Sequence, residues 1–160
     1  MKNILFVCTG NTCRSPMAEG IFNHVVLGEE KLEGVRAFSA GVSAFSGDGA
    51  NPKAQKAVKE LFGIDISGHK AKTIGEEDLK KADIILTMTE GHKKIILSVV
   101  PEAESKIWTL KEYVSGYKKT DESLDVQDPY GMGEEEYKSC AKELKHLIDE
   151  LIEKLKKEGS

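Results

Sequence analysis

An unbroken apolar segment directly before a polar loop constrains the fold of this chain more than any other feature of its sequence. Residues 3–7 are N-I-L-F-V, and a run of this kind is typical of a strand buried on both faces of a parallel sheet. The following residues, C-T-G-N-T-C-R-S-P, are polar and include a glycine. Pro16 can occupy the first turn of a helix in which Met17, Ile21 and Val25 recur at fours. The segment therefore predicts a strand, a loop and the N-terminus of a helix.

Strand and helix patterns alternate along the rest of the chain. The expected elements are a strand at Val35–Ala40, a helix from Pro52 that Gly63 ends, a strand at Ile84–Leu86, a helix at Glu90–Val99, a short strand at Lys106–Leu110 and an amphipathic helix from Tyr137 to Leu155 that packs on the sheet. The polar residues from Tyr117 to Asp125 predict a surface loop. The alternation favours an α/β fold, an open parallel sheet with helices on both faces, in which ligands bind outside the carboxyl ends of the strands. The loop after the first strand lies at that edge.

The length and composition of the chain suit one domain that spans residues 1–160, since 39% of the residues are hydrophobic and 31% are charged. The net charge is −4 and no basic block could follow a nucleic-acid backbone, so nucleic acid is not an expected partner. The apolar run at Ile4–Val7 is too short for a secretory segment, and no stretch approaches a membrane span. Three cysteines without a disulfide-framework pattern favour a reducing compartment. These observations predict a cytoplasmic protein without a membrane partner.

Cys8 lies where the first strand meets the polar loop. N–H groups of a tight loop and of the following helix can converge there and bind an anion. The same field stabilises a thiolate, which is the nucleophilic form of cysteine. Arg14, six positions later, can fold back over the loop, offer two donors to a phosphate and stabilise the charge of the transition state. The pattern C-x5-R-S, between an apolar strand and a proline-started helix, therefore predicts a phosphate-binding loop with a cysteine nucleophile.

Two other roles for the loop cysteines have weaker support. An isolated cysteine after a strand is most often a buried core thiol, but here the strand, the loop, the arginine and the helix start occur together. A zinc site on Cys8 and Cys13 would need further ligands, and no recognisable spacing supplies them. We therefore expect no metal at this loop.

Three motifs resemble those of the low-molecular-weight protein tyrosine phosphatases. They are V-C-T-G-N-T-C-R-S-P-M-A-E at residues 7–19, S-A-G at residues 39–41 and D-P-Y-G at residues 128–131. The resemblance covers nearly the whole chain. It implies a single domain with a four-stranded parallel sheet flanked by helices, catalysis without a metal or another cofactor, and a cysteinyl-phosphate intermediate. Phosphorylated protein side chains are the substrates that it implies.

The resemblance also implies roles for individual residues, carried over by motif. Cys8 is the nucleophile, Arg14 clamps the phosphate and Asp128 is the general acid. Asn11 braces the loop, and Ser15 donates a hydrogen bond to the thiolate. The residues expected to bind phosphate or substrate are Thr9, Gly10, Asn11, Thr12, Cys13, Ser15 and Tyr130.

The residues alone give Asp128 and Tyr130 modest support. Asp-Pro is a frequent turn opener, and Asp121 and Asp125 are close in sequence. Hydrolysis nevertheless needs an acid for the leaving group and then a base for water, and one carboxyl group can serve both steps. Tyr130 can form an aromatic wall of the pocket or lie at the edge of the core.

The histidines are expected to have no catalytic role. His69 matches a position of the family that makes a structural hydrogen bond. We expect His24, His92 and His146 to be surface residues.

Thr12 bears on which phosphorylated side chain is the substrate. Family members that act on phosphotyrosine usually have a larger aliphatic residue at this position, and the loop, together with T-L-K-E-Y-V and D-V-x-D-P, most resembles the bacterial protein-arginine phosphatase branch. A hydroxyl can pair with a guanidinium N–H, whereas isoleucine cannot. The alternative is that Thr12 only satisfies a backbone group of the loop.

Other activities stay open on the sequence alone. Phosphotyrosine phosphatase is the direct competitor of the phosphoarginine prediction. An arsenate reductase passes electrons along further cysteines, and only Cys140 stands outside the loop. A phosphocarrier would keep its phosphocysteine intact and would have no use for Asp128 as an acid. Cys8 and Cys13 could also form a reversible disulfide on oxidation, or Cys13 could simply pack beneath the loop.

Overall fold

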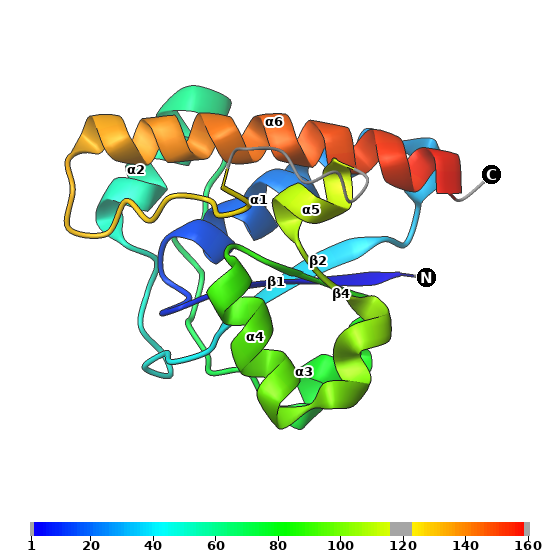
Figure 1. Ribbon diagram of the computed structural model, residues 1–160. Coiled ribbons are helices and arrows are strands. Elements are labelled where there is room, and N and C mark those ends of the chain that lie inside the picture. Colours follow the sequence, from blue (N-terminus) through cyan, green and yellow to red (C-terminus); the bar gives the residue numbers. More distant parts are fainter. Residues whose placement is uncertain (1, 116–122, 159–160) are drawn as a thin grey trace.

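The computed structural model describes residues 2–115 and 123–158, and its centre is a parallel sheet (Figure 1). The strands are β1 (Asn3–Cys8), β2 (Arg36–Gly41), β3 (Ile84–Thr87) and β4 (Ile107–Thr109). Their order is β2-β1-β3-β4, and all neighbouring pairs are parallel. The prediction of an α/β fold with a four-stranded parallel sheet is confirmed.

Helices cover both faces of the sheet, as predicted (Figure 1). One face carries α1 (Arg14–Val26), α2 (Pro52–Phe62), α5 (Leu110–Val114) and α6 (Glu134–Glu158). The other face carries α3 (Glu76–Lys81), α4 (Glu90–Val99) and the 3-10 helix η2 (Pro101–Lys106). A further 3-10 helix, η1 (Glu30–Leu32), follows α1. The α2 helix ends at Gly63, which has the left-handed φ of 70° that the pattern at its C-terminus predicts.

The residues of β1 alternate between two hydrophobic cores, which explains why the apolar run has no polar positions. Ile4 and Phe6 belong to the core beneath α1 and α6, whereas Leu5 and Val7 belong to the core beneath α3 and α4. All four side chains are fully buried. Because β1 pairs with a strand on each side, its last residue, Cys8, lies in the middle of the sheet's carboxyl edge.

The long helix α6 buries the apolar positions that its sequence pattern predicts. They are Tyr137, Ala141, Leu144, Ile148, Leu151 and Leu155. α6 contacts α1, α2 and α5, and its buried side chains share one hydrophobic core with Ile4 and Phe6 of β1. α6 therefore belongs to the group of helices that covers this face of the sheet (Figure 1).

The sequence patterns did not predict α3 and α5, because neither helix is long enough for a hydrophobic period. Their first turns are instead closed by side-chain caps. Asp78 Oδ2 accepts a hydrogen bond from Gly75 N at 2.9 Å, and Thr109 Oγ1 accepts one from Glu112 N at 3.0 Å. In α5 the T-x-x-E capping box is therefore the only local signal.

Two sequence expectations, a surface loop and the lack of a membrane span, can be compared only with the residues that the structure describes. Most of the predicted surface loop from Tyr117 to Asp125 lies outside them, because they leave out 116–122. Within 2–115 and 123–158, no helix combines the length and the apolar character that crossing a membrane requires.

Candidate active site

The loop between β1 and α1 lines a pocket at the carboxyl edge of the sheet. Cys8 ends β1, α1 begins at Arg14, and the intervening residues curve between the end of β2 and the start of α4. The pocket has a volume of about 260 Å³. Its lining residues are Cys8, Thr9, Gly10, Thr12, Cys13, Arg14, Ser43, Phe45, Asp48, Asp128 and Tyr130. The structure therefore brings the predicted loop and the distant D-P motif to one place.

Asn11 holds the loop from within. It is fully buried and has a left-handed φ of 57°, a conformation that asparagine tolerates better than most residues. Its side-chain N–H groups donate to Ser15 Oγ at 2.9 Å and to Ser39 Oγ at 3.0 Å. Its side-chain oxygen accepts from Lys72 N at 3.0 Å. These bonds account for the side-chain donors and acceptor of Asn11, so the geometry agrees with its predicted bracing role.

Cys8 and Ser15 form the contact most relevant to nucleophilic chemistry. The Cys8 side chain is buried, and its Sγ lies 2.8 Å from Ser15 Oγ. Because Ser15 Oγ already accepts a hydrogen bond from Asn11, its own proton is free to be donated to the sulfur. A hydroxyl donor at this distance stabilises a thiolate, the role that the family resemblance implies for Ser15.

Two further groups fix the loop from outside. His69 Nε2 donates to the Asn11 carbonyl at 2.7 Å, so the structural hydrogen bond predicted for His69 is confirmed. Gly41, in the S-A-G motif, lies so close to the loop that a Cβ on it would be 2.4 Å from the Thr9 carbonyl oxygen. Only glycine allows this approach without moving the loop.

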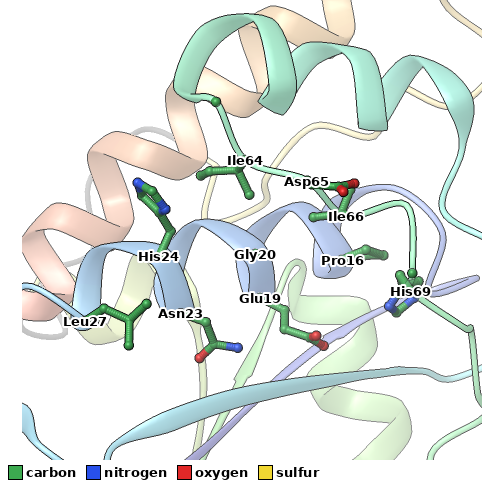
Figure 2. Close-up of a pocket in the computed structure, with 12 residues that line it drawn as sticks. Pro16, Glu19, Gly20, Asn23, His24, Leu27, Ile64, Asp65, Ile66 and His69 are labelled. Carbon is green, nitrogen blue, oxygen red and sulfur yellow. The ribbon is translucent and has the colours of Figure 1, made fainter.

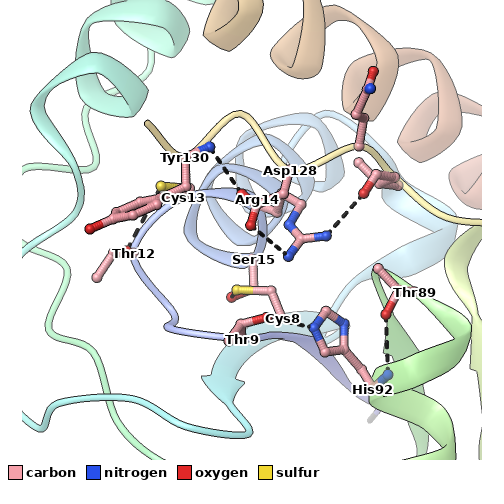
Figure 3. Close-up of polar contacts among 12 residues, drawn as sticks. Cys8, Thr9, Thr12, Cys13, Arg14, Ser15, Thr89, His92, Asp128 and Tyr130 are labelled. Atoms are coloured by element: carbon pink, nitrogen blue, oxygen red, sulfur yellow. Dashed lines mark hydrogen bonds and ion pairs between the residues drawn. The ribbon is translucent and has the colours of Figure 1, made fainter. Parts of the chain in front are cut away.

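Arg14 is buried beside the pocket and points toward the D-P segment. Its Nη1 donates to the Val126 carbonyl at 3.0 Å, and its Nη2 lies 3.4 Å from Asp128 Oδ2 (Figure 3). The bond to Val126 fixes the orientation of the guanidinium plane. The Nη2 side of the guanidinium, next to Asp128, can then donate hydrogen bonds to an anion in the pocket.

Asp128 opens a turn and also faces the pocket. Its Oδ1 accepts a hydrogen bond from Tyr130 N at 3.0 Å, while its other oxygen faces Arg14. Its side chain is 48% exposed, as a group that exchanges protons with substrate and water requires. Tyr130 is 71% exposed and lines the pocket, so its position agrees with a pocket wall and contradicts the edge of the core.

Thr12 and Cys13 both line the pocket, but their side chains have different surroundings. The Thr12 hydroxyl lies 3.8 Å from Cys13 Sγ, and it makes no hydrogen bond to a backbone group of the described residues. Cys13 is buried, its Sγ lies 3.4 Å from the Tyr137 hydroxyl, and burial raises the pKa of its thiol. Thr12 is therefore available to a ligand, whereas Cys13 is packed under the loop as a neutral thiol.

His92 is not a surface residue, and the expectation from the sequence is wrong. It is only 5% exposed, and its Nε2 lies 2.9 Å from Thr9 Oγ1 (Figure 3). Burial and the charge of Arg14 lower its pKa from 6.5 to about 4. The missed signal is its place in the first turn of α4, directly after β3, because helix starts at this edge of a parallel sheet face the ligand site.

The pocket also contains residues that the sequence analysis did not single out. Ser43, Phe45 and Asp48 come from the segment between β2 and α2, for which the sequence patterns predicted no site. Their signal is positional, because this segment leaves the carboxyl end of β2, the neighbour of β1.

A larger cavity, of about 460 Å³, lies along the opposite side of α1 and includes Glu19, His24, Asp65 and His69 (Figure 2). It contains none of the cysteines. Glu19 Oε1 accepts a hydrogen bond from Ser39 at 2.6 Å. Because Ser39 Oγ itself accepts one from Asn11, Glu19 supports the loop through Ser39. Within the described ranges 2–115 and 123–158, no cluster of three or more histidine, cysteine or carboxylate side chains could hold a metal ion.

Comparisons with known proteins agree with this geometry. The sequence profile of one family, described as low molecular weight phosphotyrosine protein phosphatase, matches residues 3–160. A protein-arginine-phosphatase of Geobacillus stearothermophilus is 44% identical over 155 residues, 97% of each chain. The crystal structure of a low molecular weight protein tyrosine phosphatase from T. tengcongensis is 51% identical with a TM-score of 0.86, covering 96% of this chain and 99% of that one. A structure of the YwlE arginine phosphatase, a mutant with a phosphorylated active-site serine, is 40% identical with a TM-score of 0.87. It covers 97% of this chain and 96% of that one. These relatives are named for two different substrates.

Proposed function

Because this chain belongs to the low molecular weight phosphotyrosine protein phosphatase family, we propose that it hydrolyses phosphoarginine residues of proteins through a cysteinyl-phosphate on Cys8. The family and the relatives make the chain a phosphatase. The observation that carries the mechanism is the 2.8 Å contact between Cys8 Sγ and Ser15 Oγ, in a pocket that Arg14 and Asp128 also line.

In the first half-reaction the Cys8 thiolate attacks the phosphorus atom and the P–N bond of phosphoarginine breaks. Ser15 donates to the sulfur and keeps it ionised before the attack. Arg14 binds the phosphoryl oxygens and stabilises the charge that develops on them. Asp128, 3.4 Å from Arg14, gives a proton to the departing guanidine nitrogen.

In the second half-reaction water attacks the phosphocysteine. Asp128, now a carboxylate, takes a proton from this water, and the P–S bond breaks. Inorganic phosphate leaves and the Cys8 thiolate is restored, with Ser15 again as its hydrogen-bond donor. One carboxyl group therefore acts first as an acid and then as a base.

The preference for phosphoarginine is supported by Thr12 and by the relatives. The Thr12 hydroxyl lines the pocket and makes no backbone hydrogen bond among the described residues. It can accept a hydrogen bond from a guanidinium N–H, which would otherwise lose its water without a replacement. The relative from Geobacillus stearothermophilus, which is 44% identical, is named for this activity.

Phosphotyrosine is the second candidate substrate, and the aromatic side chains at the pocket favour it. Phe45 and Tyr130 both line the pocket and are 80% and 71% exposed. Such rings can stack on a phenyl group. The relative from T. tengcongensis, which is 51% identical, is described as a tyrosine phosphatase.

Arsenate reduction has less support, because its electron relay needs a second reactive thiol. Cys140, outside the loop, is buried, and burial raises the pKa of its thiol to about 12. A thiol of this kind is a poor nucleophile at neutral pH. A phosphocarrier is also disfavoured, because Asp128 lines the same pocket as Cys8 and a carboxylate there can activate water against a phosphocysteine.

We extend the proposal to a cytoplasmic location. Cys8, Cys13 and Cys140 are all free thiols, and free thiols persist in a reducing compartment.

The test offers the purified protein a phosphoarginine protein and a phosphotyrosine protein side by side, with a metal chelator present. We expect a higher kcat/KM for phosphoarginine, no turnover by Cys8→Ser, and retained turnover by the control Cys140→Ser. A higher kcat/KM for phosphotyrosine would favour the second candidate. Full activity in Cys8→Ser would overturn the covalent mechanism itself.

A further inference from the structure

His92 connects α4 to the first residue of the phosphate loop. Its backbone N–H donates to Thr89 Oγ1 at 3.1 Å, which caps the helix. Its ring reaches the loop on the other side, with Nε2 2.9 Å from Thr9 Oγ1 (Figure 3). Thr9 follows Cys8 directly, so this contact acts next to the nucleophile.

The surroundings of the ring favour one neutral tautomer. His92 Nδ1 is the single buried side-chain nitrogen or oxygen in residues 2–115 and 123–158 that has no hydrogen-bond partner. A proton on Nδ1 would be a buried N–H without an acceptor, an arrangement that folded proteins avoid. The proton therefore belongs on Nε2, which donates to Thr9 Oγ1.

The Thr9 residue is held at two points. Its side chain accepts from His92, and its carbonyl oxygen accepts from Ser43 N at 2.9 Å. In a trans peptide the N–H of the next residue points away from that carbonyl. The next residue is Gly10, which lines the pocket. Holding Thr9 at both points therefore fixes the direction of the Gly10 N–H.

His92 and His69 contact the loop from different elements. His69, from the segment after α2, holds the Asn11 carbonyl at 2.7 Å. His92, from α4, holds Thr9. The loop is therefore fixed on both sides of Gly10, at Thr9 and at Asn11, by side chains that do not themselves line the pocket.

We propose that His92 is a positioning residue for phosphoryl transfer, which keeps Thr9 and the Thr9–Gly10 peptide in the orientation that binds phosphoryl oxygens. The proposal rests on the proposed function, because it concerns the same loop. It assigns a role in phosphate binding to a side chain that is not among the residues lining the pocket.

The test measures two quantities, the binding of inorganic phosphate by calorimetry and kcat/KM for a phosphorylated protein. His92→Leu and Thr9→Val each remove the hydrogen bond. Each is expected to lower the affinity for phosphate and kcat/KM roughly tenfold, which is the effect expected from the loss of one hydrogen bond. The double variant should lose no more than either single one. His92→Gln, which retains an amide N–H near the Nε2 position, should recover most of the loss.

Ile96→Ala provides the matched control. Ile96 is buried on the same helix, one turn beyond His92, and belongs to a hydrophobic core that includes no residue of the loop. It should lower the melting temperature but leave phosphate binding unchanged. Thr9 is exposed, so Thr9→Val tests the same bond even if His92→Leu fails to fold.

Unchanged phosphate binding in both Thr9→Val and His92→Leu, or losses that add in the double variant, would overturn the positioning role. The calorimetric readout is independent of turnover. If the wild-type protein hydrolyses neither substrate while His92→Leu still weakens phosphate binding, the proposed function is wrong and the positioning role stands.

Discussion

Gly41→Ala tests whether the close approach of β2 to the phosphate loop is required. A Cβ on Gly41 would lie 2.4 Å from the Thr9 carbonyl oxygen, 3.0 Å from Asn11 N and 3.1 Å from the Gly10 carbonyl carbon. All three are backbone atoms, so no flexible side chain can give way. Gly41 itself is held on its other side, since its N–H donates to the Lys72 carbonyl at 2.9 Å and its carbonyl accepts from Ile74 at 2.8 Å. The loop therefore has to move.

The size of the effect follows from these distances. An ordinary contact begins at 3.4 Å, so the carbonyl of Thr9 must shift by about 1 Å, and a misplacement of this size can reduce catalysis about a hundredfold. Overpacking of this kind costs about 1–3 kcal/mol in the free energy of unfolding. Alanine also restricts the unfolded chain more than glycine does. This stabilises the folded state by about 0.4–1 kcal/mol, which offsets only part of that cost.

Urea unfolding and phosphate affinity together measure this prediction. Gly41→Ala should lower the free energy of unfolding and the affinity for phosphate. Gly28→Ala is the control, because its Cβ would meet only Val25 O at an ordinary 3.7 Å. Wild-type phosphate affinity and turnover in Gly41→Ala would refute the reasoning, since the loop would then tolerate the displacement.

Three further predictions concern the substrate, oxidation and pH. Thr12→Ile removes the hydroxyl and adds bulk at the pocket, so the ratio of kcat/KM for phosphoarginine to that for phosphotyrosine should fall by roughly one to two decades; equal losses for both would leave Thr12 a structural residue. Cys8 and Cys13 line the same pocket, so mild peroxide should oxidise Cys8 and join it to Cys13 in a disulfide that dithiothreitol reverses, although Cys13 is itself a neutral thiol; thiol mapping that finds inactivation without this crosslink would contradict it. Because burial and Arg14 lower the pKa of His92 from 6.5 to about 4, against the attraction of Asp125 and Asp128, the unfolded chain binds a proton in this interval that the folded chain does not. The free energy of unfolding should therefore fall as pH decreases from 6.5 to 4, by at most about 3 kcal/mol from this group. His92→Gln should show a correspondingly shallower fall when urea unfolding is measured across this pH range. Parallel curves of stability against pH for the two proteins would contradict this.

The features that the sequence predicted well have local causes. The β1 run is unbroken because both faces of that strand are buried. Gly63 ends α2 because glycine accepts the left-handed conformation. The loop motif predicted that Cys8 and Arg14 lie together, and both line one pocket because a tight turn joins β1 to α1.

The features that it missed depend on contacts between distant parts of the chain. His92 stands in the polar run E-G-H-K-K, which is typical of a surface, yet its partner Thr9 is 83 positions away. Likewise, the D-P motif alone could not distinguish a turn from an acid, and Asp128 turns out to open a turn and to face Arg14. Such pairings are set by sheet order, which local patterns do not encode.

The most direct test of the central claim is to identify the residue that carries the phosphoryl group. Asp128→Asn removes the base for the second half-reaction, so with p-nitrophenyl phosphate, whose leaving group needs no proton donor, the intermediate should accumulate. After rapid quenching, mass spectrometry should find one phosphoryl group on the peptide that contains Cys8, and none when Cys8→Ala is added to Asp128→Asn. Turnover without this adduct, or an adduct on another residue, would contradict catalysis through Cys8.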